Sequence, residues 1–134
     1  MIHTRLIVAA LALAALPAHP QGFLDRWSDK LIERHGQDAR KEYIQKLAGD
    51  RDPRQRAEAA DWLATQREPE AVAALATALA SDSDARVREA AASALWRGRD
   101  NAQAARPQLL AALDDTDPNV VAQAAGALQA LGMK

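Results

Sequence analysis

Hydrophobic side chains recur along most of this chain with the spacing of an α-helix. Two segments carry apolar residues at positions i, i+3 or i+4, i+7 and beyond, which places them on one helical face. These stripes consist of Val87, Ala90, Ala91, Ala94 and Leu95 in the first segment and of Val120, Ala124, Ala127, Leu128 and Leu131 in the second. A shorter stripe, Val72, Leu75, Ala76 and Leu79, follows the same rule. The pattern predicts amphipathic helices.

The helical pattern also repeats along the chain. Segments 52–63, 84–95 and 117–128 align with one another at nearly equal offsets. Each begins with an aspartate (Asp52, Asp84 or Asp117) where a helix N-cap belongs, and Pro53 and Pro118 follow at a first helical position. A repeat of this length, built from helical signals, predicts a solenoid of stacked helix hairpins.

We predict repeat units at residues 50–81, 82–113 and 114–134. The second unit's second helix contains Pro107, Leu109, Leu110 and Leu113, so Pro107 must lie in or near its first turn. The third unit is incomplete, because the chain ends at Lys134 directly after its first helix. We expect that helix to cap the array; alternatively it completes its packing against a partner, or the chain is a fragment of a longer array.

Residues 23–49 do not match the repeat. An apolar stripe indicates one helix in this segment: Leu24, Trp27, Leu31 and Ile32. We expect Gly36 to end this helix and His35 to interact with the negative end of the helix dipole at its C-terminus. A second helix follows from Ala39. We predict that this pair caps the solenoid, and that Trp62 fills the gap between the cap and the first unit.

The N-terminal segment 1–22 has the pattern of a secretory signal peptide. Arg5 precedes an apolar run, Leu6–Leu16, and Pro17 and Pro20 follow. The run is too short to span a bilayer comfortably. We predict cleavage near residue 18, no membrane span after processing, and an exported protein, periplasmic or secreted. The alternative is a buried N-terminal helix of a cytosolic protein.

The repeat units resemble HEAT repeats, of the short kind also called PBS-lyase HEAT-like repeats. The resemblance rests on residues 87–91 (Val-Arg-Glu-Ala-Ala) and on residues 105–113, and it extends over about residues 50–132. It implies an all-α, right-handed α–α superhelix. It also implies a ladder of hydrogen-bonded Asp and Arg side chains between units. Asp52/Arg56 and Asp84/Arg88 match the ladder positions, whereas Val121 replaces the arginine of the third unit, so we expect the ladder to stop there.

Composition narrows the possible functions. The 134 residues include 33 alanines and no cysteine, which favours helices and excludes disulfides and thiolate sites. The formal net charge is −1, which argues against a nucleic-acid partner. Outside the leader and its boundary the one histidine is His35, and no nucleophile has a base near it in the sequence. We therefore expect no enzyme, no cofactor and no metal.

Two surfaces are candidates for binding a protein or peptide. The first is the loop between the two predicted helices of unit two, which contains Trp96, Arg97 and Arg99. Trp and Arg are enriched at binding hot spots. Thr77 and Gln108 lie on the outward side of the second helices, which is small and uncharged. We expect an interaction or scaffold module. The alternatives are a lyase or chaperone for a bound chromophore, which only the family resemblance suggests, and a structural subunit of an envelope complex.

Overall fold

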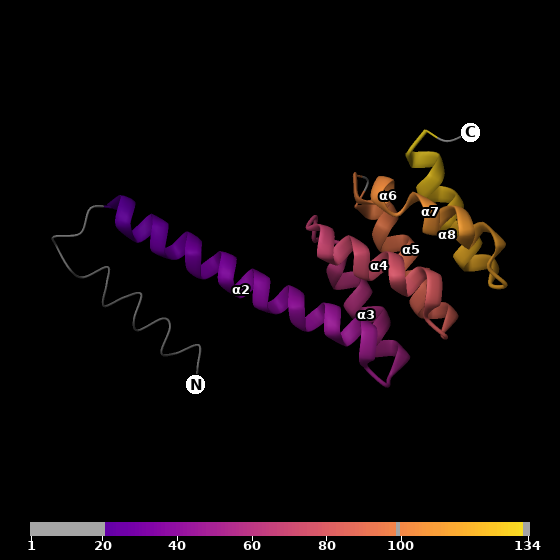
Figure 1. Cartoon of the computed structure of the whole chain (residues 1–134), viewed down its shortest axis with the longest axis horizontal. Helices are drawn as coiled ribbons and strands as arrows, with labels where there is room; N and C mark the ends of the chain where they lie inside the picture. Colours follow the sequence, from indigo (N-terminus) through magenta and orange to yellow (C-terminus); the bar gives the residue numbers. More distant parts are fainter. Residues whose placement is uncertain (1–20, 99, 133–134) are drawn as a thin grey trace. The chain divides into compact units, whose positions relative to one another are not determined.

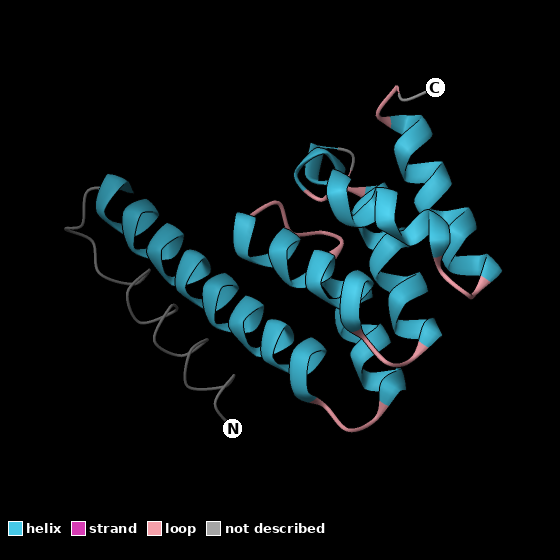
Figure 2. Cartoon of the chain, turned by 45° about the vertical axis from the view of Figure 1, so that its right-hand side comes forward, coloured by secondary structure: helices cyan, strands magenta, loops and turns pink. Residues whose placement is uncertain are grey.

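The computed structural model describes residues 21–98 and 100–132, and these residues form helices and short loops without a strand (Figures 1 and 2). The α-helices are α2 (Gln21–Gly49), α3 (Pro53–Leu63), α4 (Pro69–Ser81), α5 (Ala85–Arg97), α6 (Asp100–Ala104), α7 (Arg106–Ala111) and α8 (Pro118–Ala130). A 3-10 turn, η1 (Ala112–Asp114), extends α7. Residues 1–20 of the predicted signal peptide (1–22) and Arg99 lie outside the described residues.

The chain divides into two units, Met1–Gly36 and Gln37–Lys134. Helix α2 contributes to both, and it corrects the prediction of a capping helix pair, because one helix runs through Gly36. His35 therefore does not stand at a helix end. A glycine within a helix costs only about 1 kcal/mol. The helix formers on both sides, including Glu33, Arg34 and Gln37, outweigh that cost.

Within Gln37–Lys134, helices with equivalent places in the repeat pack against one another. The first helices form a row in which α3 contacts α5 and α5 contacts α8. The second helices lie beside them, with α4 against α5 and α7 against α4 (Figure 1). The predicted all-α fold of stacked helix pairs is confirmed.

Small side chains allow the close packing of these helices. The fully buried positions include Ala59, Ala60, Ala71, Ala91 and Ala124. The largest fully buried side chains are Leu63, Leu75, Leu95, Leu109, Val87 and Val120. Each unit therefore contributes between one and three large side chains and a background of alanine. This composition brings helix axes close together, because alanine adds little thickness between them.

The second helix of unit two is broken into two pieces. Pro107 stands in the first turn of α7, where its missing N–H costs no hydrogen bond. The residues before it form the separate short helix α6. The proline thus sets where α7 begins.

At the other end of the array, Trp62 stacks on Tyr43. The ring centroids are 4.2 Å apart and the planes are inclined by 11°. Tyr43 belongs to the last turns of α2 and Trp62 to α3, so the pair joins the helix that precedes the repeats to the first repeat. Leu47 of α2 is buried in the same core.

Candidate functional site

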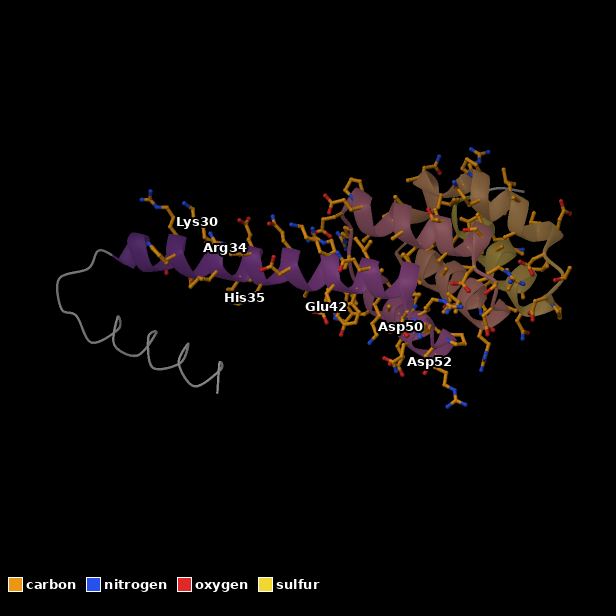
Figure 3. The ribbon with its side chains drawn as sticks, turned by 60° about the horizontal axis from the view of Figure 1, so that its bottom comes forward. Lys30, Arg34, His35, Glu42, Asp50 and Asp52 are labelled. Carbon is orange, nitrogen blue, oxygen red and sulfur yellow. The ribbon has the colours of Figure 1, made fainter. Side chains whose placement is uncertain are left out.

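Each repeat begins with an Asp-x-Asp loop that holds the start of its first helix. The second aspartate of each loop (Asp52, Asp84 and Asp117) accepts a hydrogen bond from the backbone N–H two residues later, at 2.8–2.9 Å. These three residues are the N-caps of α3, α5 and α8. Figure 3 shows the first loop, with Asp50 and Asp52 labelled before α3.

The first aspartate of the loop, not the cap, binds the ladder arginine. Arg56 donates from Nε and Nη2 to the two carboxylate oxygens of Asp82, at 2.9 and 3.0 Å. Arg88 does the same to Asp115, at 2.9 and 3.1 Å. The family resemblance placed both arginines in the ladder but chose the wrong aspartates.

The correction has a simple physical reason. The carboxylates of Asp52 and Asp84 are turned back onto the amides of their own helices, so the residue two positions earlier faces the neighbouring unit. The repeated Asp-x-Asp spacing in the sequence was the signal that could have identified Asp82 and Asp115.

Each ladder arginine also holds its own loop. Nη1 of Arg56 donates to the carbonyl of Asp50 at 2.8 Å, and Nη1 of Arg88 donates to that of Asp82 at 2.9 Å. Both arginine side chains are mostly buried. The hydrogen bonds to the carboxylates raise the pKa of both guanidinium groups, and the hydrogen bond from Arg88 lowers the pKa of Asp115. The ladder therefore joins each first helix both to its own loop and to the loop of the next unit.

Trp96 packs mainly within the protein. Its ring lies over α8 at Gly126, where an added Cβ would come within 2.8 Å of the ring. It is still 42% exposed and lines a hollow of about 410 Å³ with Arg97, Ser93 and Gln123. Arg97 forms an exposed ion pair with Asp61 at 2.7 Å. The predicted contribution of Arg99 falls on a residue outside the described ones.

Thr77 and Gln108 lie together on a different surface. They line one hollow of about 550 Å³ between α4 and the α6–α7 segment, whose walls include Ala73, Ala76 and Ala104. The side-chain oxygen Oε1 of Gln108 is buried, and it has no hydrogen-bond partner among the described residues. The structure therefore brings Thr77 and Gln108 together and separates them from Trp96 and Arg97.

A second hollow lies on the other flank of α4. It measures about 520 Å³, and Ile44, Leu47, Ala74 and Ala78 form its apolar part. Thr77 lines both hollows. The exposed face of α4 is thus a ridge of small side chains with a depression on each side. Sequence reasoning had identified the ridge and the Gln108 side but not the contribution of α2.

Among the described residues, no group of three His, Cys, Asp or Glu side chains is placed to hold a metal ion. The carboxylates with the clearest partners cap helices or bind the ladder arginines. No helix in the described part of the chain is long and apolar enough to cross a bilayer.

Comparison with known proteins identifies a family. The family of HEAT repeats matches residues 7–96, which is more than half of the chain. The match begins within the apolar run Leu6–Leu16 and ends at Trp96, the penultimate residue of α5. A comparison with curated proteins gives no match. Together with the stacked helix pairs, the extent of the match shows that the chain belongs to the HEAT-repeat family.

Proposed function

We propose that this chain is an exported, non-catalytic scaffold that binds a protein partner on the exposed face of α4. HEAT repeats are generally protein-interaction modules. The observation that carries the choice of surface is the ridge of α4, on which Thr77 separates two hollows of about 520 and 550 Å³.

The chemistry of this face supports a peptide or helical segment as the bound element. Its exposed residues Ala73, Thr77 and Ala80 are small and uncharged, so the main chain or a helix of a partner can approach closely. Gln108 offers a buried carbonyl oxygen without a partner in the described structure. A buried acceptor of this kind costs about 1–3 kcal/mol. An N–H donor supplied by a partner would recover that free energy after rotation of the side-chain amide.

Matched substitutions test the surface. Ala73→Arg places a long cation on the α4 face, and Ala122→Arg makes the same change on the exposed side of α8, away from both hollows. We expect partners captured from the exported fraction by the unmodified chain to be lost with Ala73→Arg and retained with Ala122→Arg. Retention of every partner by Ala73→Arg would reject the α4 face as the binding surface.

Export is a separate part of the proposal, supported by the sequence pattern of Arg5, the apolar run Leu6–Leu16 and Pro17. Fractionation of expressing cells, followed by mass measurement of the protein from the exported fraction, tests it. We expect a shortened chain that begins near residue 18, and a full-length chain confined to the cytoplasm would contradict export.

A further inference from the structure

The hollow between α4 and the α6–α7 segment, which we call the α4–α7 hollow, carries its charge at one end. Arg67, in the loop before α4, is the one charged group among the described residues that line it. The other lining residues are uncharged, and they include Pro69 and Val72 in the first turn of α4 and Thr77 two turns later. The hollow therefore presents a cation beside a mostly apolar floor.

The acidic residues next to Arg67 are engaged on the other flank of α4. Glu68 forms an ion pair with Arg40 of α2, and its second carboxylate oxygen accepts from the backbone N–H of Arg67. Glu70 pairs with the same Arg40 at 3.8 Å. Arg67 itself is exposed and forms no ion pair within the described residues. A carboxylate supplied by a partner can therefore pair with Arg67 without breaking an existing ion pair.

The unpartnered acceptor of Gln108 lies further along the same hollow. In the repeat register that equates Asp82 with Asp115, Gln108 occupies the position that Leu75 has in α4. Its Oε1 atom is buried and has no hydrogen-bond partner among the described residues. A helix rises by about 1.5 Å per residue, so Gln108 stands about 9 Å along α4 from Pro69, and Arg67 lies beyond that proline. The hollow thus has a cation and an acceptor at separate points along its length.

The dimensions of the hollow favour an extended segment over a helix. Its lining on α4 runs from Pro69 to Thr77, about 12 Å of helix axis. A partner helix about 10 Å across would occupy roughly 900 Å³ over that length, whereas the hollow measures about 550 Å³. An extended chain is thinner, and its backbone N–H groups are not already bonded within the segment as they are in a helix. One of them can donate to Gln108 after rotation of the side-chain amide.

We propose that the α4–α7 hollow binds an extended segment of a partner protein that carries an aspartate or a glutamate. The carboxylate pairs with Arg67, and a backbone N–H of a residue about three or four positions away donates to Gln108. An extended chain advances about 3.3 Å per residue, which matches the separation of the two groups. This inference rests on the function proposed above, because it names the chemistry of the partner at one of the two hollows of the α4 face.

Selection from a library of random heptapeptides displayed on phage tests the acidic residue. The full unmodified chain should enrich peptides with Asp or Glu at one fixed position. Arg67→Glu reverses the charge of the hollow, so it should enrich Lys or Arg at that position instead. Arg54→Glu makes the same change at an exposed arginine of α3, outside the hollow, and should keep the acidic preference. An acidic preference that survives Arg67→Glu, or no enrichment by the unmodified chain, would overturn the inference.

The affinity of one enriched peptide, labelled with fluorescein, shows whether its carboxylate contacts Arg67. Replacing the acidic residue of the peptide by its amide, or Arg67 by Gln, should weaken binding about threefold to fivefold at low salt. The two changes together should weaken it no further, because they remove the same ion pair. Independent, additive losses would contradict the contact.

Gln108→Leu separates binding from folding at the other polar group. Leucine is the residue at the equivalent position of α4, and the substitution removes a buried acceptor that has no partner in the described structure. The variant should resist urea at least as well as the parent and bind the enriched peptide about threefold or more weakly. Unchanged affinity would contradict the proposed backbone hydrogen bond.

Ala73→Arg distinguishes a failure of this inference from a failure of the proposed function. Ala73 lines the α4–α7 hollow, so the enriched peptides should no longer bind this variant. Loss of binding with Ala73→Arg, together with an acidic preference that Arg67→Glu leaves unchanged, would keep the α4 face as the binding surface and reject the role of Arg67. Peptides that still bind Ala73→Arg would count against the α4 face itself.

Discussion

At the scale of single residues, the ladder arginines illustrate how surroundings decide the value of an ion pair. Arg88 and Arg86 each pair with an aspartate, but the Arg88–Asp115 pair is mostly buried and Arg86 is exposed. Loss of Arg88 also leaves the carbonyl of Asp82 without that donor. Buried polar groups without partners cost far more than exposed ones.

We therefore expect Arg88→Ala to lower the free energy of unfolding by about 2 kcal/mol. Arg86→Ala removes the same chemical group from an exposed position and should leave denaturation by urea nearly unchanged. Chemical denaturation of the two variants beside the parent checks the difference. Equal losses would show that the ladder contributes no more than a surface ion pair.

Asp115 should make the free energy of unfolding depend on pH in the acidic range. The hydrogen bond from Arg88 lowers the pKa of Asp115 in the folded state. Its stabilising effect is therefore complete above the unfolded pKa of about 3.9 and is lost as the pH falls through the lower folded value. Below about pH 4, the free energy of unfolding should therefore fall less steeply with decreasing pH in Asp115→Asn than in the parent, as denaturation curves at several pH values would show. The control is Asp114→Asn, because Asp114 is an exposed neighbour without an ion pair in the described structure. If the free energy of unfolding changed equally with pH in the two variants, the expectation would be contradicted.

At the scale of helices, the sequence predicted the starts of elements better than their continuity. Asp-Pro and Asp-x-Asp loops act through local hydrogen bonds, so the starts of α3, α5 and α8 are readable from neighbouring residues. Gly36 was expected to end a helix, yet its unfavourable propensity is small beside the preference of the residues around it. The ladder partners were also missed, because Arg56 and Asp82 are far apart in the sequence and only packing selects between two nearby aspartates.

The continuity of α2 can be tested directly at Gly36. A Cβ added there meets no atom within 4 Å, and the backbone is already helical. Gly36→Ala should therefore stabilise α2 by about 0.5–1 kcal/mol and increase the helical signal in circular dichroism. A loss of helicity would favour the hairpin that the sequence first indicated.

At the scale of the whole repeat array, the family and the stacking of helix pairs were predictable, because a regular period in the sequence reports the architecture without any detail of packing. The candidate binding surface was only partly predictable. Thr77 and Gln108 share a hollow because α4 and α7 pack side by side, and Trp96 is held by Gly126 of the next unit. Such neighbours come from different units, so they become visible only when the units are stacked.

The ladder also connects the units to one another through Asp82. Its carboxylate accepts from Arg56 and its carbonyl accepts from Arg88, so one residue is shared by two rungs. Residues that share a hydrogen-bond network have coupled effects on stability, and residues without shared partners have additive ones. Denaturation of Arg56→Ala, Arg88→Ala and the double variant should therefore give a coupling of about 0.5 kcal/mol or more. Substitutions of Arg54 and Arg86, which share no hydrogen-bonded residue in the described structure, should be additive in the same cycle. Additivity of the ladder arginines would mean that each rung holds its own pair of units independently of the other.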